Sequence, residues 1–225
     1  MKREEALQAG WFGELPEDVS DGICSIGEWV RFDKGDIIFE HGAEEADLYG
    51  LASGSICMHI AMGEHEQRLA HICGPGFWFG DFEFVSGASR MMAVEAAEDV
   101  LLLRVRRSDF LKLAKVQPDI WRWIALLAVQ HITIAVGAAD DLMLPSVKKR
   151  VAAVLLRLSG RRFAHPASKP MSTIYLTQLE LAVAANLSRA AAGKILREMA
   201  ESGAIKIDYG SIRILNPVAL AAKLL

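Results

Sequence analysis

Short apolar runs alternate with polar turns along the first half of the chain, from Trp29 to about Val105. Most of these turns contain glycine, as in Lys34-Gly35-Asp36 and Gly74-Pro75-Gly76. Many short strands at regular spacing, bounded by turn residues, are typical of an all-β barrel or sandwich. We therefore predict a β-rich domain over residues 1–117, with strands among the apolar runs 37–40, 48–52, 55–62, 68–73 and 100–105.

The period of the apolar pattern changes at Pro118-Asp119, where proline suits the first turn of a helix and aspartate complements the helix dipole. No proline follows until after Met143, which predicts a helix about 36 Å long. Its apolar residues lie on nearly all faces of the predicted helix, so other parts of the protein must cover the helix on more than one side. A second copy of the chain is the natural cover for one side, and burial inside one large monomer is the alternative. The expected dimer-interface residues are Trp123, Ile124, Leu127, Ile132, Ile134 and Val136.

The chain carries three scattered cysteines, Cys24, Cys57 and Cys73, and no C-x-x-C pair. This pattern predicts neither a disulfide framework nor a zinc site, and we expect reduced thiols in a cytoplasmic protein without a bound metal. The charged N-terminus lacks the apolar run of a signal peptide. Arg122 and His131 interrupt the most apolar stretch, 121–139, so we expect a buried helix there and no membrane span.

Residues 176–214 predict a helix-turn-helix followed by a wing. Thr177 and Glu180 have the spacing of a capping box, and Leu179, Ala182 and Val183 are the expected buried face of the first helix. The turn at 186–188 begins with asparagine, which tolerates a left-handed backbone, and ends with serine, which caps a second helix over about 189–202. Two short helices joined in this way form the helix-turn-helix arrangement. The segment 205–214 then predicts two short strands around a Tyr-Gly turn.

The composition of the second helix suits entry into the major groove of DNA. Small residues permit close approach, while Arg189 and Lys194 can reach guanine acceptors or phosphates. Lys206 or Arg213 of the wing can rest on the DNA backbone. The candidate DNA-binding residues are Thr177, Ser188, Arg189, Ala190, Ala191, Gly193, Lys194, Arg197, Lys206 and Arg213.

The charge distribution supports this interpretation. Residues 146–225 contain 13 Lys and Arg against 4 Asp and Glu, whereas residues 1–145 contain 12 against 24. The net charges of +9 and −12 together give the chain's −3. A basic end joined to an acidic body is the electrostatic signature of a nucleic-acid binder, although a basic face can also serve solubility alone.

Several motifs in fixed order resemble the Crp/Fnr family, the cyclic-AMP receptor and fumarate-nitrate regulators of bacterial transcription. They are FDKGDIIFEHG at 32–42, SG at 53–54, PGFWFGD at 75–81, GASR at 87–90, the helix after 118–120, and LTQLELA with NLSRAAAGKILREM within 176–199. The resemblance covers about residues 29–225 and implies an α+β fold. It implies a β-roll sensor domain over 1–117, a dimerisation helix and hinge over 118–145, and a winged helix-turn-helix DNA-binding domain over 146–225.

The pocket implied by the resemblance is degenerate in this sequence. Its residues correspond to Phe79, Gly80, Asp81, Arg90, Met91, Ala135 and Val136. Family members that bind cyclic nucleotides have a glutamate after FG and an Arg-Ser or Arg-Thr pair. Here an aspartate and a methionine stand at these places, and apolar side chains replace the hydroxyls that contact adenine. Arg90 can still pair with a phosphate, but we do not expect cyclic AMP to be the natural effector.

Other cofactors are not indicated. Cys24 alone does not supply the cysteine cluster of the iron–sulfur branch, and His71 and Cys73 are interpreted as strand residues because no second haem ligand is evident. Asp81 and Glu83 resemble acid–base carboxylates, but no phosphate-binding loop, nucleophile elbow or metal motif accompanies them, so we do not expect an enzyme. The effector is left as an unknown small molecule or redox signal.

The recognition helix also departs from the family. Arg189 is kept, whereas Ala190 replaces a glutamate and Lys194 replaces an arginine, so we expect a different half-site in which Arg189 reads a guanine. The expected partners are double-stranded DNA and a second copy of the chain, with loop 161–169 as a candidate contact for RNA polymerase. The alternative is a ligand-binding or protein-interaction module whose helix-turn-helix is vestigial.

Overall fold

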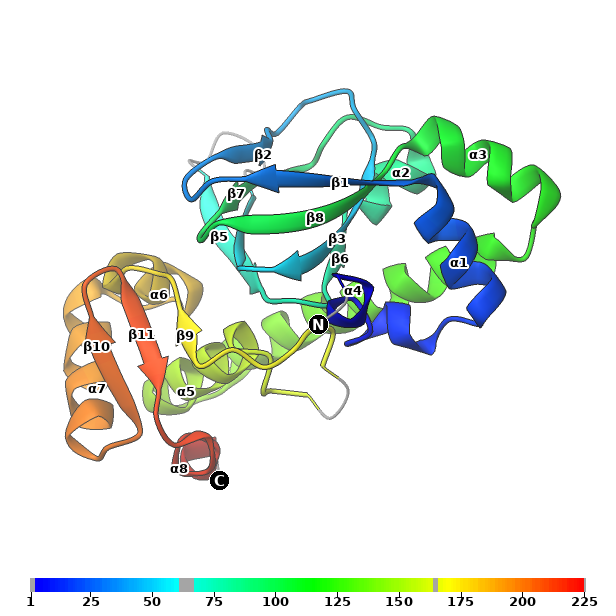
Figure 1. Cartoon of the computed structure of the whole chain (residues 1–225). Coiled ribbons are helices and arrows are strands. Elements are labelled where there is room, and N and C mark those ends of the chain that lie inside the picture. The colour runs from blue at the N-terminus through cyan, green and yellow to red at the C-terminus, as the bar shows by residue number, and fades with distance from the viewer. Residues whose placement is uncertain (1–2, 61–66, 164–165, 225) are drawn as a thin grey trace.

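The computed structural model describes residues 3–60, 67–163 and 166–224 (Figure 1). The chain starts with two short 3-10 helices, η1 (Arg3–Ala6) and η2 (Trp11–Glu14), and helix α1 (Glu17–Ile26). The ring of Phe12 stacks on Trp78 with centroids 4.9 Å apart, and the indole N–H of Trp11 donates to the backbone oxygen of Trp123 at 2.7 Å. These aromatic contacts attach the N-terminal segment to both the β domain and the long helix.

The β domain consists of two four-stranded antiparallel sheets. One has the order β1-β8-β3-β6 and the other β2-β7-β4-β5. The predicted strands at 37–40, 48–52, 68–73 and 100–105 are confirmed; of the run 55–62, residues 61 and 62 lie outside the described residues. The strands are β1 (Gly27–Phe32), β2 (Ile37–Phe39), β3 (Leu48–Ser53), β4 (Ile56–Ile60), β5 (Arg68–Cys73), β6 (Trp78–Phe79), β7 (Met92–Ala96) and β8 (Val100–Val105).

Two helices lie between or after these strands where the sequence pattern did not predict them. Helix α2 (Asp81–Ser86) connects β6 to β7, and helix α3 (Arg107–Val116) follows β8. Helix α2 begins after Gly80 and ends before Gly87, both of which have a left-handed backbone at φ 92° and 71°. It is therefore a short helix of six residues bounded at each end by a glycine with a left-handed backbone.

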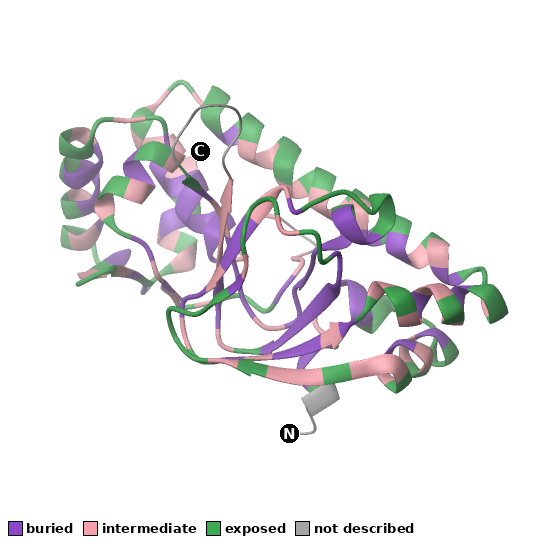
Figure 2. Cartoon of the chain, turned by 90° about the horizontal axis from the view of Figure 1, so that it is seen from above, coloured by how far each residue is buried: buried purple, intermediate pink, exposed green. Residues whose placement is uncertain are grey.

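The long helix α4 (Ile120–Met143) runs under the β domain, as Figure 1 shows. One face packs into the core through Ile120, Ile124 and Leu127, all fully buried. The predicted place of Ile124 and Leu127 at a dimer interface is therefore wrong, because the β domain and the N-terminal segment already cover them. The opposite side of α4 is exposed along much of its length (Figure 2).

The C-terminal part is a winged helix. Its elements are α5 (Val147–Leu158), β9 (Thr173–Ile174), α6 (Gln178–Ala184), α7 (Arg189–Glu201), β10 (Ile205–Asp208), β11 (Ser211–Ile214), α8 (Pro217–Ala221) and η3 (Ala222–Leu224). The strands form one antiparallel sheet in the order β10-β11-β9. Helix α6 buries Leu181 and Ala182, whereas Leu179 and Val183 are 55% and 43% exposed, so the predicted burial of these two is wrong.

The winged helix packs directly on the β domain. Leu69 and Ile72 of β5 belong to the same apolar cluster as the cores of α5, α6 and α7. At the edge of this contact, the hydroxyl of Tyr175 donates to Glu98 at 3.0 Å. The α+β fold class is confirmed, and the two parts are in direct contact.

Candidate nucleic-acid interface and effector pocket

Local hydrogen bonds fix both helices of the helix-turn-helix. The Thr177 hydroxyl accepts from the backbone N–H of Glu180 at 3.2 Å, and the Glu180 carboxylate accepts from the N–H of Thr177 at 2.6 Å, which confirms the capping box. Asn186 has a left-handed backbone at φ 51°. The Ser188 hydroxyl accepts from the N–H of Ala191 at 3.2 Å and starts α7. The turn chemistry therefore sets the start of the recognition helix.

Helix α7 presents a basic edge to solvent. Arg189, Ala190, Lys194 and Arg197 are exposed, while Ala192, Ile195, Leu196 and Met199 are buried. The prediction that Gly193 lies on the exposed face is wrong. Gly193 is buried, and an added Cβ there would lie 3.3 Å from the side-chain oxygen of Gln178. The absence of a side chain at 193 therefore lets α6 and α7 approach each other.

The wing is a hairpin of β10 and β11 whose tip carries the fully exposed Tyr209 and Gly210. Lys206 and Arg213 both face Asp208, at 2.9 Å and 3.4 Å. This shared carboxylate draws the two cations together on one side of the hairpin and partly neutralises them. A cavity of about 500 Å³ separates the wing from the start of α7; Thr177, Arg189 and Tyr209 are among its lining residues.

The effector-pocket residues of the β domain cluster around Arg90. Phe79 is buried and stacks on Tyr49, with ring centroids 5.4 Å apart. Gly80 has no room for a side chain, because an added Cβ would lie 2.7 Å from a guanidinium nitrogen of Arg90. The structure thus brings Phe79, Gly80, Asp81, Arg90 and Met91 together.

Ala135 and Val136 do not join this cluster. Both are exposed on α4, and Val136 is 64% exposed. The long helix instead reaches the cluster one turn earlier, where the Nδ1 of His131 lies 2.8 Å from the Asp81 carboxylate. Sequence reasoning missed His131 because its partner lies 50 residues away.

Arg90 already has an anionic partner. Its side chain is fully buried, and Nη1 lies 3.1 Å from the Glu83 carboxylate. Nη2 donates to the backbone oxygen of Asp47 at 2.6 Å, and the guanidinium sits 4.0 Å from the centre of the Phe39 ring. The two carboxylates Asp81 and Glu83 therefore have separate partners, His131 and Arg90.

Two further ionisable groups lie behind the pocket. His71 is fully enclosed, and burial, reinforced by the positive charge of Arg157, lowers its pKa to about 3. Burial also raises the pKa of the Cys73 thiol well above its ordinary value. Both side chains are therefore uncharged at neutral pH.

Among residues 3–60, 67–163 and 166–224, no group of three or more His, Cys, Asp or Glu side chains is arranged to hold a metal ion.

A buried ion cluster joins the end of α4 to the DNA-binding part. Asp141 is fully buried, and its two oxygens lie 3.1 Å from Nε of Arg157 and 2.9 Å from Nε of Arg162. Arg157 also reaches the backbone oxygen of Ala70 in β5 at 3.5 Å. The cluster connects α4, β5 and the DNA-binding part, and no local sequence pattern indicates it.

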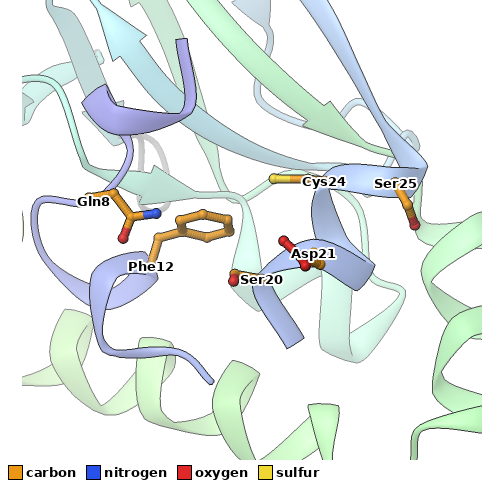
Figure 3. A pocket seen from close by; sticks show the side chains of 6 residues that line it. All are labelled: Gln8, Phe12, Ser20, Asp21, Cys24 and Ser25. Atoms are coloured by element: carbon orange, nitrogen blue, oxygen red, sulfur yellow. The ribbon is translucent and has the colours of Figure 1, made fainter. Parts of the chain in front are cut away.

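A second cavity, of about 340 Å³, lies between η2 and α1, away from both sites (Figure 3). Its lining residues are Gln8, Phe12, Ser20, Asp21, Cys24 and Ser25. The close-up shows Gln8 and Phe12 on one side and the residues of α1 on the other. The cavity contains none of the predicted site residues.

Comparisons with known proteins agree with this architecture. Residues 29–117 match the cyclic nucleotide-binding domain, and residues 149–223 match the Crp-like helix-turn-helix domain. A cyclic AMP receptor protein of Thermus thermophilus is 29% identical over 203 residues, which cover 90% of each chain. The transcriptional regulator SdrP of the same organism is 28% identical, over 86% of this chain and 93% of SdrP.

A solved structure of a Crp/Fnr-family transcriptional regulator from Thermus thermophilus superimposes with a TM-score of 0.65. It is 27% identical and covers 88% of this chain and 98% of that one. The two family matches occur in the order in which the structure places the β domain and the winged helix. With its exposed basic recognition helix, the chain belongs to the Crp/Fnr family of DNA-binding transcription regulators.

Proposed function

We propose that the chain works as a homodimer that binds a pseudo-palindromic promoter site, with α7 of each copy in the major groove. The observation that carries this proposal is the exposure of Arg189 and Lys194 on one edge of a capped helix. Half-sites about 34 Å apart would suit two such helices related by a two-fold axis. Arg189 lies at the N-terminal end of α7, where side chains reach base edges, and we assign it to a guanine.

The exposed side of α4 supports dimerisation. Leu126, Val129, Val136 and Met143 are 42%, 56%, 64% and 82% exposed. With Thr133 and Asp140, they recur at alternating steps of three and four residues, which is the spacing of a seam between two paired helices. A second copy of α4 would cover this seam.

Length and composition alone would also let α4 cross a membrane. Its other features favour the dimer. Its inner face packs on the β domain, His131 bonds to Asp81, and Asp141 bonds to two arginines of the DNA-binding part. A helix crossing lipid could not keep these polar contacts with flanking domains. We therefore propose a cytoplasmic protein.

The dimer is tested by sedimentation of the purified chain. A Val129→Glu/Val136→Glu variant would place four carboxylates along the seam of the pair, and we expect it to sediment at the monomer mass. Val116→Glu, which alters an exposed valine on α3, is the matched control and should sediment with the wild type. A monomeric wild type, or an unchanged double variant, contradicts the seam.

DNA recognition is tested by footprinting on genomic fragments, followed by titration of the protected site. We expect Arg189→Ala to cost about 1–3 kcal/mol, or roughly 5- to 150-fold in affinity. Lys206→Ala should weaken all sequences evenly and reduce the salt dependence, as loss of a phosphate contact does. Lys115→Ala, an exposed lysine on α3, is the control. Absence of a protected site at moderate salt would favour the alternative, a ligand-binding or interaction module with a vestigial helix-turn-helix.

We also propose an effector and a contact with RNA polymerase. The effector is an unidentified small molecule or redox signal sensed by the β domain. Contact with RNA polymerase is assigned to loop 161–169, of which residues 164 and 165 lie outside the described residues. Arg161 and Arg162 of this loop donate to partners within the chain, so that among the described residues of the loop Lys169 is the exposed cation. Loss of polymerase binding to the protein–DNA complex on Lys169→Glu would support this assignment, and unchanged binding would oppose it.

A further inference from the structure

The centre of the effector pocket is a buried cation, Arg90, whose two terminal nitrogens are bonded within the chain, whereas its Nε has no hydrogen-bond partner among the described residues. Arg90 has 1% of its surface exposed. A guanidinium withdrawn from water to this extent requires an anionic partner, because an unpaired buried charge is strongly unfavourable. Glu83, 4% exposed, supplies that charge at 3.1 Å. Both members of this ion pair, Arg90 and Glu83, are residues of this chain.

Glu83 satisfies a second donor as well. Its other carboxylate oxygen accepts from the backbone N–H of Met91 at 2.8 Å. One carboxylate thus binds a guanidinium and the adjacent backbone N–H with two oxygens. A phosphate bound at this place would accept from the same two donors, Nη1 of Arg90 and the N–H of Met91, because both are directed at the position of the Glu83 carboxylate. Glu83 and a ligand phosphate cannot occupy it together.

The helix that carries Glu83 has little freedom to withdraw it. Gly80 stands at the start of α2, where an added Cβ would lie 2.6 Å from the backbone oxygen of Asp47 and 2.7 Å from Arg90. At the same end of α2, Asp81 is bonded to His131 of the long helix. Withdrawal of Glu83 would therefore require movement of α2 against both the β domain and α4. It would also leave a carboxylate without its cation in an enclosed site.

We propose that Glu83 is a resident substitute for a ligand phosphate: it fills the anion subsite at Arg90, so the protein binds DNA without a cyclic nucleotide. This inference rests on the proposed function for the DNA-binding part only. The signal that controls the regulator then acts elsewhere than on Arg90. Removal of the Glu83 carboxylate should convert the closed subsite into one that accepts a phosphate, because Nη1 of Arg90 and the N–H of Met91 become free donors.

The test measures anion binding by the full chain with calorimetry and thermal shift. The probes are cyclic AMP, cyclic GMP and inorganic phosphate, added to the wild type, Glu83→Ala, Glu83→Ser and Glu40→Ala. Glu40 is an exposed carboxylate next to Phe39, and its removal changes the charge nearby without touching Arg90. We expect the wild type and Glu40→Ala to show no saturable binding of any probe up to millimolar concentration.

We expect Glu83→Ala to melt lower than the wild type and to recover stability as phosphate or a cyclic nucleotide is added, with at least about a tenfold gain in affinity. If Glu83→Ala does not fold, Glu83→Ser decides, because its short side chain removes the charge and vacates the place of the carboxylate between Arg90 and Met91. Micromolar binding of a cyclic nucleotide by the wild type would overturn the proposal. So would folded Glu83 variants that gain no stability from any of the three anions.

A separate titration of DNA, with and without cyclic AMP, distinguishes this inference from the proposed function. Equal DNA affinity in both conditions is expected, and a cyclic-AMP requirement would overturn the inference. A wild type that binds neither DNA nor the anions contradicts the proposed function while leaving the assignment of Glu83 supported.

Discussion

Removal of the Asp141 carboxylate should destabilise the protein severely. Asp141 is fully buried, and the side chain of Arg157, which it partners, is 4% exposed. Asp141→Ala leaves Arg157 enclosed without a counter-charge, whereas Arg162, at 23%, can turn toward water. Breaking one partner out of a buried ion pair costs about 3–5 kcal/mol. Since domains of ordinary size have about 5–15 kcal/mol in total, this is a large fraction of the stability.

The assay is thermal and urea unfolding at neutral pH, followed by circular dichroism. For a chain of this size, each kcal/mol moves the midpoint by about 2–4 °C, so Asp141→Ala should melt roughly 6–20 °C below the wild type. Glu44→Ala is the control, because it removes an exposed carboxylate away from α4 and should change stability by less than about 0.5 kcal/mol.

A double variant distinguishes the loss of the Asp141–Arg157 attraction from the cost of leaving Arg157 buried without a counter-charge. Asp141→Leu/Arg157→Met removes both charges and fills the site with apolar atoms, so it should be more stable than Asp141→Ala. The reasoning is refuted if Asp141→Ala melts together with Glu44→Ala, or if the double variant is no more stable than the single one.

Three further outcomes follow from the same contacts. Burial lowers the pKa of His71 to about 3, below the value of about 6.5 in an unfolded chain, so acidification below about 6.5 should cost up to about 1.4 kcal/mol per pH unit until the folded pKa is reached. His71→Leu should flatten this part of the pH–stability curve in urea titrations at pH 7 and 5, and an unchanged slope would count against it. Gly80→Ala should lower the melting temperature more than Gly35→Ala, because both have φ near +90° but only Gly80 is crowded; equal losses would show that strain alone matters. Ser188→Ala should cost about 1 kcal/mol of stability and weaken DNA binding, while Ser188→Thr should retain both, since only alanine removes the helix cap.

Local interactions were predictable from the sequence. The capping box of Thr177 and Glu180, the left-handed Asn186 and the cap at Ser188 each depend on residues within three positions of one another, and all three are confirmed. The strands within 37–40, 48–52, 68–73 and 100–105 and the start of α4 were predictable for the same reason, because alternation, glycine turns and Pro118-Asp119 are read over short windows. The family motifs added the domain order, which the fold confirms.

The sequence did not predict which face of a helix is buried where apolar residues lie on most of its faces. Helix α4 is apolar nearly all round, so the sequence could not distinguish Ile124 and Leu127, which face the core, from Val129 and Val136, which face solvent. The same ambiguity applies to the short helix α6, whose exposed Leu179 resembles its buried neighbours in composition. Only packing against the β domain chose between these faces.

The chemistry of the pocket and of the hinge was decided by tertiary structure alone. Glu83 meets Arg90, Asp81 meets His131 across 50 residues, and Asp141 meets Arg157 and Arg162. Sequence spacing shows which groups are charged, but not which of them are withdrawn from water together. Because a buried charge must find its partner wherever the fold places one, the Glu83–Arg90 pair exists only once the β domain has folded, and the pairs of Asp81 and Asp141 exist only once α4 has packed.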